Sequence, residues 1–138
     1  MNNENLIPLS VDNCWHKINA VHGTKGGVYK VIAVKLGERV PINRLLGTDP
    51  DGVLYIGKAD SFLKRVIDLR KALSPVHKSS AHGFGYRYKN TNSLNAAFPF
   101  EKLFVELIET ENARDLEYRW LKEYLDTFGE VPPLNAVL

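Results

Sequence analysis

Apolar and polar residues alternate with two different periods along the chain, and these periods predict its secondary structure. Three runs, 28–36, 53–57 and 103–109, are rich in β-branched and aromatic residues and predict strands. Two runs, 61–73 and 111–127, repeat their apolar residues every three or four positions, which predicts amphipathic helices. The order strand, strand, helix, strand, helix predicts a small α/β or α+β domain, with a central three-stranded mixed sheet flanked by helices.

Turn-forming residues separate the predicted elements. A segment rich in glycine, proline and aspartate, 37–52, forms an excursion between the first two strands. A second segment rich in glycine, serine and asparagine, 74–99, predicts a long loop after the first helix. Gly129 ends the second helix, and an extended tail follows it.

Length and composition indicate one globular domain. The chain has 138 residues, of which 44% are hydrophobic and 25% are charged, and this argues against disorder and coiled coil. Residues 1–25 carry apolar residues of their own, so we expect a lead-in that packs on a domain of residues 26–138. No apolar run is long enough to span a bilayer, the first residues do not resemble a secretory signal, and Cys14 is the single cysteine. We therefore expect a cytoplasmic protein without disulfides and without a membrane partner.

The net charge of +2 conceals an uneven distribution. Residues 58–89 hold eight Lys and Arg against two Asp, whereas residues 90–138 hold four against nine Asp and Glu. A basic middle third that also carries aromatic residues predicts contact with nucleic acid. The alternative is a solvated helix face followed by a charged loop. The candidate DNA-binding residues are Lys64, Arg70, His77, Lys78, His82, Arg87 and Lys89.

One acidic residue lies where an apolar residue is expected. When 111–127 is drawn as a helix, Glu117 falls at the centre of an apolar stripe formed by Ala113, Leu121, Tyr124 and Phe128. A buried carboxylate without a partner is unfavourable, so Glu117 needs a cation, a metal ion or several hydrogen-bond donors. It is either half of a structural ion pair or a metal ligand or catalytic group in a cleft.

The first predicted helix supplies a counterpart for this carboxylate. Arg70 falls within its apolar stripe and Arg65 at the border of the stripe, whereas Lys64 and Lys71 point to solvent. Either arginine could pair with Glu117, and helical periodicity does not distinguish them.

A series of short motifs and single residues runs through the chain. In chain order they are Gly27-Val28-Tyr29, Tyr55-Ile56-Gly57, Lys58, Arg65, Glu117 and Pro133-Leu134-Asn135. They resemble the two tripeptides, the lysine, the essential arginine, the metal-binding glutamate and the closing asparagine of the GIY-YIG nuclease superfamily. The resemblance covers residues 26–136, and the helical pattern singles out Glu117 independently.

The resemblance implies a GIY-YIG-like fold and a metal-dependent endonuclease that hydrolyses DNA phosphodiester bonds, in restriction, repair or mobile-element biology. It implies that Glu117 binds Mg²⁺ or Mn²⁺, whose preferred ligands are hard oxygens. It implies that Arg65 donates to the phosphate oxygens, where negative charge builds up during the reaction. Asn135 would position the site from the tail.

The resemblance also implies a tyrosine as the proton acceptor. Tyr29 or Tyr55 would take the proton of the attacking water, and Lys58 is the expected cation that lowers the tyrosine pKa from its usual value of about 10. We favour Tyr29 slightly, because the first strand can bring it beside the metal, although Tyr55 is closer to Lys58 in the sequence.

The chain departs from the family pattern at two places. The two tripeptides stand farther apart here, because the excursion 37–52 lies between them. Several members carry a histidine one turn after the arginine, where this chain has Leu69. His77 or His82 in the following segment could replace that histidine.

Two other functions stay open beside the enzyme. One is a catalytically silent nucleic-acid-binding module with the same fold, and the other is a structural domain in which Glu117 and Arg70 form a buried pair. The presence of Tyr29, Tyr55, Arg65, Glu117 and Asn135 together favours the nuclease, since a pure binder need not keep a carboxylate on its apolar face. One site per chain predicts that a monomer nicks one strand, and that a double-strand break needs a homodimer formed through 37–52 or 1–25.

Overall fold

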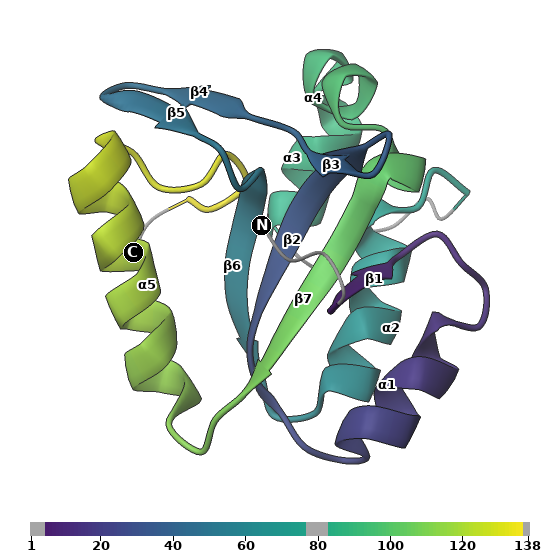
Figure 1. The fold of residues 1–138 in the computed structure, drawn as a ribbon. Helices are drawn as coiled ribbons and strands as arrows, with labels where there is room; N and C mark the ends of the chain where they lie inside the picture. The colour runs from purple at the N-terminus through teal and green to yellow at the C-terminus, as the bar shows by residue number, and fades with distance from the viewer. Residues whose placement is uncertain (1–4, 77–82, 137–138) are drawn as a thin grey trace.

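An antiparallel sheet forms the centre of the protein in this computed structural model, which describes residues 5–76 and 83–136 (Figure 1). The strands are β1 (Leu6–Pro8), β2 (Gly27–Lys35), β3 (Glu38–Arg39), β4 (Ile42–Arg44), β5 (Gly47–Asp49), β6 (Val53–Ala59) and β7 (Leu103–Glu109). The helices are α1 (Cys14–His22), α2 (Phe62–Leu73), α3 (Gly83–Asn90), α4 (Asn92–Ala97) and α5 (Ala113–Phe128). A short 3-10 helix, η1 (Phe100–Lys102), leads into β7.

Strand β2 lies in the middle of the sheet. It pairs with β6 on one side and with β7 on the other, β1 continues the sheet beyond β7, and β3 folds back onto the end of β2. Strands β4 and β5 form a separate hairpin, and every pairing among the described residues is antiparallel. The prediction of a small α+β domain is confirmed. The predicted three-stranded mixed sheet is wrong in two respects: its described pairings are all antiparallel, and β1 and β3, too short to give a periodic signal, extend it to five strands.

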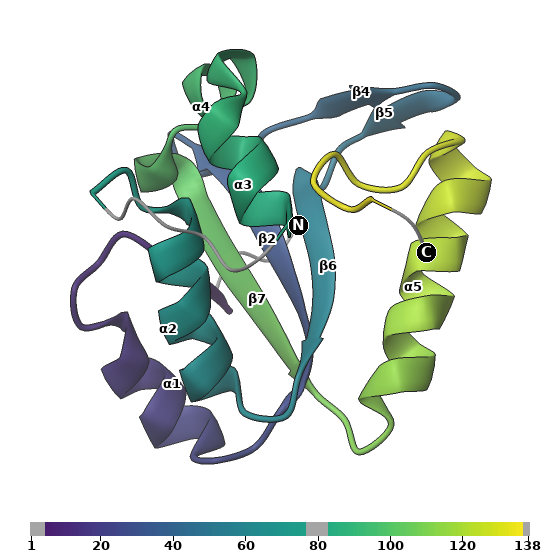
Figure 2. The ribbon, with the colours of Figure 1, turned by 180° about the vertical axis from the view of Figure 1, so that it is seen from behind.

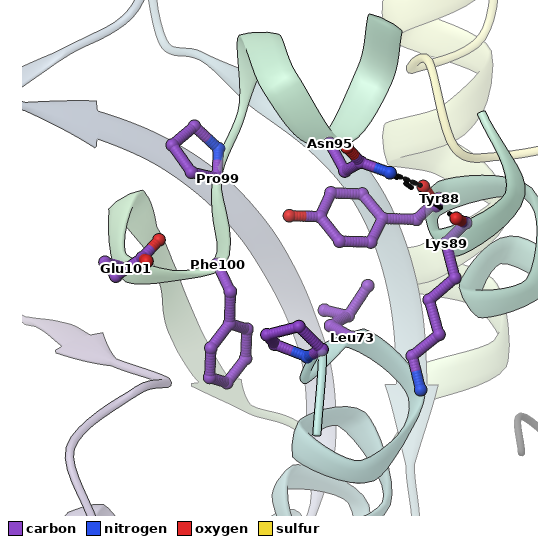
Figure 3. Close-up of a pocket in the computed structure, with 8 residues that line it drawn as sticks. Leu73, Tyr88, Lys89, Asn95, Pro99, Phe100 and Glu101 are labelled. Atoms are coloured by element: carbon purple, nitrogen blue, oxygen red, sulfur yellow. Dashed lines mark hydrogen bonds between the residues drawn. The ribbon is translucent and has the colours of Figure 1, made fainter. Parts of the chain in front are cut away.

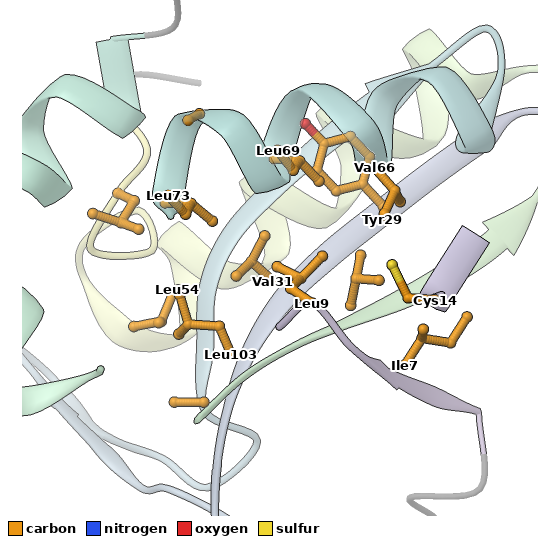
Figure 4. Packing of buried hydrophobic residues seen from close by; sticks show 14 of the residues in the cluster. Ile7, Leu9, Cys14, Tyr29, Val31, Leu54, Val66, Leu69, Leu73 and Leu103 are labelled. Atoms are coloured by element: carbon orange, nitrogen blue, oxygen red, sulfur yellow. The ribbon is translucent and has the colours of Figure 1, made fainter. Parts of the chain in front are cut away.

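Helices cover both faces of the sheet (Figure 1, Figure 2). Helices α1 and α2 lie on one face, and α5 lies on the other. Because successive residues of a strand point to opposite faces, Tyr29 packs in the core cluster under α2, while its neighbour Val28 packs under α5. Figure 4 shows the larger cluster, where α2 covers β2 and β6. Full burial of one Leu or Val side chain stabilises a protein by roughly 1.5–3 kcal/mol, so this cluster holds α2 firmly on the sheet.

The ends of the two longest helices follow from their sequence. Ser61 precedes α2, and its Oγ accepts a hydrogen bond from the Lys64 amide at 3.4 Å. Gly129 ends α5 in the left-handed conformation, with φ of 78°, where a residue with a side chain would be strained. The Gly129 amide closes the helix on the Leu125 carbonyl at 2.8 Å. The end of α5 at Gly129 agrees with the prediction.

The described part of the lead-in, from residue 5 to residue 25, supplies β1 and α1. Strand β1 pairs with β7, and α1 packs against α2. Leu9, Cys14 and Ile18 lie buried in the same core cluster as the central strands. The lead-in is thus part of the hydrophobic core.

The prediction of a long loop over 74–99 is wrong where the structure describes that segment. Helices α3 and α4 lie within it. Two glycines lower the intrinsic helix propensity of α3, so tertiary contacts decide its structure. One such contact is the buried Tyr88, whose hydroxyl donates to the Phe98 carbonyl at 2.6 Å. Three candidate residues of this segment lie outside the described residues: His77, Lys78 and His82.

Candidate active site

The two predicted tyrosines meet above a glycine. The pairing of β2 with β6 places Tyr29 opposite Gly57, and the Tyr29 and Tyr55 ring centroids lie 6.0 Å apart with 34° between the planes. A Cβ atom on Gly57 would lie 2.5 Å from Cζ and Oη of Tyr29 and 2.7 Å from Cε2 of Tyr55. The glycine of the second tripeptide therefore leaves the space that both phenol rings occupy.

Two charged side chains, Arg65 and Glu117, act on these tyrosines, and a third, Lys58, acts on Glu117. Burial raises the pKa of the half-buried Glu117 carboxyl, while the positive charges of Lys58 and Arg65 lower it. Burial also raises the pKa of Tyr29 and Tyr55, and in both phenols the Arg65 charge lowers the pKa and the Glu117 charge raises it. These five residues come from β2, β6, α2 and α5, and we call them the β6 cluster. All five residues of the β6 cluster are candidate catalytic residues in the sequence.

The two tyrosines differ in burial and in their hydrogen bond. Tyr29 is 2% exposed, whereas Tyr55 is only partly buried. The hydrogen bond between them raises the pKa of Tyr29 and lowers that of Tyr55, as expected when Tyr29 donates and Tyr55 accepts. Tyr55 therefore has the more accessible and the more easily ionised oxygen of the pair.

Arg65 is a cation that lowers the pKa of both tyrosines. The expectation that Lys58 does so stays a prediction: Lys58 stands three residues after Tyr55, so its side chain leaves β6 on the opposite face. There it acts on the pKa of Glu117. The charge of Lys58 thus favours the ionised form of the Glu117 carboxyl.

Asn135 lies along the outer edge of β6. Its Oδ1 accepts a hydrogen bond from the Ile56 amide at 3.0 Å, and its Nδ2 donates to the Ile56 carbonyl, also at 3.0 Å. The Leu134 amide donates to the Leu54 carbonyl at 2.8 Å. The tail therefore bonds to β6 as a neighbouring strand would, one residue away from Tyr55 and Gly57.

Of the two arginines that the sequence left open as partners of Glu117, Arg70 is engaged elsewhere. Arg70 Nη2 lies 3.3 Å from Oδ1 of Asp12, and the guanidinium lies over the Trp15 ring, 5.4 Å from its centroid. Arg70 therefore ties α2 to the lead-in, and Arg65 is the arginine that acts on Glu117.

Two more of the predicted DNA contacts are occupied inside the protein. Arg87 Nη1 donates to the carbonyls of Asn135 at 3.3 Å and Pro133 at 3.5 Å. Lys89 Nζ donates to the Lys71 carbonyl at 2.9 Å, and burial lowers the Lys89 pKa. Lys64 is exposed, as the sequence predicted.

One buried acid, Asp49, is missing from the candidate residues drawn from the sequence, and it is 1% exposed. Its carboxylate accepts hydrogen bonds from the amides of Asp51 at 2.8 Å and Val53 at 3.1 Å, and from the Tyr124 hydroxyl at 2.9 Å. Burial, followed by the contact with Asp49, raises the Tyr124 pKa. The turn composition of 48–52 is the only available signal, because aspartate often caps amides two residues on in turns. This acid ties the hairpin to α5, which carries Glu117.

The donor set around Glu117 can be compared with the needs of a divalent cation. Among residues 5–76 and 83–136, no three His, Cys, Asp or Glu side chains gather as a metal site. Mg²⁺ usually keeps several waters and takes one or two carboxylates together with substrate phosphate oxygens. A single half-buried glutamate fits that pattern.

Two cavities, of about 460 Å³ and 510 Å³, are lined by residues outside the β6 cluster. One, of about 460 Å³, is lined by Leu73, Tyr88, Lys89 and Phe100 among others (Figure 3). No residue of the β6 cluster lines it.

The chain matches no protein-family model, no curated protein and no solved structure. Within the described residues, no helix has the length and apolar character needed to cross a membrane. Function is therefore inferred from the side chains at the edge of β6.

Proposed function

We propose that this protein is a metal-dependent endonuclease of the GIY-YIG type that hydrolyses DNA phosphodiester bonds. One observation carries the proposal: at β6, the charges of Arg65 and Glu117 act on the pKa of both Tyr29 and Tyr55, and the charges of Lys58 and Arg65 act on the pKa of Glu117. Perturbed titratable groups of opposite charge, gathered at one place, are typical of catalytic sites.

Glu117 is the proposed ligand of the divalent cation, Mg²⁺ or Mn²⁺. Its carboxylate is half-buried and its pKa is raised by burial, so the charged form gains from a cation beside it. A bound cation of this kind polarises the scissile phosphate and offsets the charge on the leaving oxygen. Lys58 favours the charged carboxylate that such binding requires.

Arg65 is the proposed phosphate contact. A planar guanidinium can give two parallel hydrogen bonds to phosphate oxygens, which a lysine cannot. Arg65 belongs to α2, and its charge acts both on the Glu117 carboxyl and on the phenols of Tyr29 and Tyr55. Its positive charge would also stabilise the phenolate form of the tyrosine that accepts the proton.

Tyr55 is the better proposed acceptor of the proton from the attacking water. Tyr29 favours the neutral form more strongly, because it is 2% exposed and donates its hydrogen to Tyr55. The same hydrogen bond stabilises negative charge on the Tyr55 oxygen. Tyr29 then orients Tyr55, and the slight preference for Tyr29 drawn from the sequence is replaced by this assignment.

The proposal is tested by incubating the purified chain with supercoiled plasmid. We expect nicked plasmid in Mg²⁺ or Mn²⁺ and none in excess chelator. Binding of a short duplex is measured in the same buffers. Binding without cleavage in either metal would replace the nuclease by a silent nucleic-acid-binding module, and neither binding nor cleavage would remove both functions.

A further inference from the structure

The tail after α5 is held from two directions. On one side, Arg87 of α3 donates to the backbone carbonyls of Asn135 and Pro133, at 3.3 Å and 3.5 Å. On the other side, the side-chain amide of Asn135 makes two hydrogen bonds of 3.0 Å with the backbone of Ile56 in β6. The tail therefore lies between α3 and the edge strand, bonded to both.

The tail itself is compact and partly buried. The backbone amide of Asn135 donates to the Pro132 carbonyl at 3.0 Å, and this hydrogen bond closes a turn. Leu134 is 2% exposed and belongs to the larger core cluster. The turn thus sets the direction of the Asn135 side chain, and the Arg87 contacts hold the carbonyl end of that turn.

Ile56 is the residue through which this contact reaches the β6 cluster. Its amide and carbonyl point outward, where β6 has no further strand among the described residues, and Asn135 satisfies both groups. Its neighbours in the sequence are Tyr55, the proposed proton acceptor, and Gly57, which makes room for both phenol rings. A shift of the backbone at Ile56 therefore moves the phenol of Tyr55.

We propose that Arg87 is a positioning residue for this site: by holding the carbonyls of Pro133 and Asn135, it keeps the Asn135 side chain on Ile56 and so fixes the orientation of Tyr55. The catalytic part of this inference rests on the proposed nuclease function, whereas the structural part does not. Arg87 is half-buried and bonded to the tail, so the role that its charge suggested in the sequence, DNA binding, is replaced by an internal one.

The structural part is tested by hydrogen exchange at the Ile56 amide in the full chain. In Arg87→Met we expect this amide to exchange about tenfold faster, because the loss of one or two hydrogen bonds loosens its acceptor on Asn135. Arg87→Lys keeps a donor and should restore part of the protection. Lys89→Met is the matched control, because Lys89 lies on the same helix and also donates to a carbonyl, that of Lys71. In Lys89→Met the Ile56 amide should exchange at the wild-type rate. In every variant the central amides of β2 should keep their protection from exchange.

The catalytic part is tested by the split between kcat and KM for plasmid nicking. A positioning role predicts that Arg87→Met lowers kcat about tenfold or more while KM and its salt dependence stay unchanged. A DNA-binding role predicts a higher KM and a salt slope smaller by about one unit. Unchanged exchange at Ile56, or faster exchange with unchanged kcat, would overturn the proposal. If the wild-type chain cleaves nothing, the nuclease function fails, and the exchange experiment still decides whether Arg87 holds the tail.

Discussion

Gly57 illustrates how one missing side chain shapes the β6 cluster. The phenol carbons and the hydroxyl of Tyr29 come so near its Cα that an added methyl group would overlap them. This explains physically why a glycine ends the second tripeptide. It also means that the glycine and the tyrosine of the first strand form one packing unit.

We expect Gly57→Ala to destabilise the protein by about 1–3 kcal/mol, which is the usual effect of overpacking a tight site. Urea unfolding measures this loss. The same substitution in a Tyr29→Leu background should be less harmful, because Leu lacks the Cζ and Oη atoms that lie 2.5 Å from the new methyl. Equal losses in both backgrounds would show that the overlap with Tyr29 is not the cause.

Glu117→Gln should raise the stability of the metal-free protein at pH 7. Burial raises the Glu117 pKa above its ordinary value of 4.5, so the folded state is penalised for the charged form. Below pH 4.5 the wild-type carboxyl is itself becoming neutral, and the advantage of the variant should fade there. Urea unfolding at both pH values checks the sign. Added Mg²⁺ should then stabilise the wild type and leave the variant unchanged, and equal stabilisation of both would argue against Glu117 as the metal ligand.

The sequence pattern identifies the charged residues of the site, but it does not show which of them form pairs. Glu117 was found because a carboxylate interrupts an apolar stripe, a signal that helical periodicity can carry. Which arginine it meets depends on how α2 lies on the sheet, and a one-dimensional pattern cannot give that. Two contacts lie beyond local patterns: Arg87 donates to the carbonyls of Pro133 and Asn135, and Asp49 accepts from the Tyr124 hydroxyl, all between residues far apart in the chain.

At the scale of elements, the excursion between the two tripeptides has a defined structure. It forms the β4–β5 hairpin, which reaches the far end of α5 through a hydrogen bond from the Leu46 amide to the Phe128 carbonyl at 2.9 Å. Arg44 Nη2 donates to the Val131 carbonyl at 2.6 Å. The hairpin therefore braces the helix that carries Glu117.

Asp49→Ala should remove this support and destabilise the protein by about 2–3 kcal/mol, since a buried charged acceptor of three hydrogen bonds is lost and the Tyr124 hydroxyl is left without it. The control is Asp51→Ala, an exposed residue of the same turn, which should stay within about 0.5 kcal/mol of the wild type. Thermal or urea unfolding compares the two. Similar losses for both variants would contradict the role given to Asp49.

Long periodic elements could be predicted, and short ones could not. The strand at 103–109 and the helix after Ser61 were located closely, because many residues share one period and the ends carry capping residues. Strand β1 has three residues and depends on β7 for its hydrogen bonds, while α3 contains two glycines and depends on buried Tyr88. Their structure follows from tertiary contacts that local propensity does not contain.

At the scale of the whole molecule, the basic middle third is less available to DNA than its composition indicated. Arg70, Arg87 and Lys89 each bond to groups of the protein itself. Lys58 and Lys64 are exposed, at and near the β6 cluster. The proposed DNA surface is therefore smaller and closer to Glu117 than the sequence suggested.

We expect the double change Lys58→Met and Lys64→Met to reduce the slope of log K against log salt by about two units for duplex binding, since each phosphate contact contributes about 0.9. Arg70→Met should leave the slope unchanged, because Arg70 is engaged with Asp12. Fluorescence anisotropy at several salt concentrations measures both. A flatter slope for Arg70→Met alone would move the DNA surface toward the lead-in.

Plasmid cleavage by Glu117→Gln is the most direct test of the central claim, that the β6 cluster is a metal-dependent nuclease site. Glu123→Gln is the matched control, because Glu123 is an exposed acid on the same helix. In Mg²⁺ the wild type and Glu123→Gln should nick supercoiled plasmid at similar rates, while Glu117→Gln should bind DNA but lose nicking by a factor of at least about 10². Undiminished nicking by Glu117→Gln, prepared in the same way, would contradict the assignment of this carboxylate and of the site built around it.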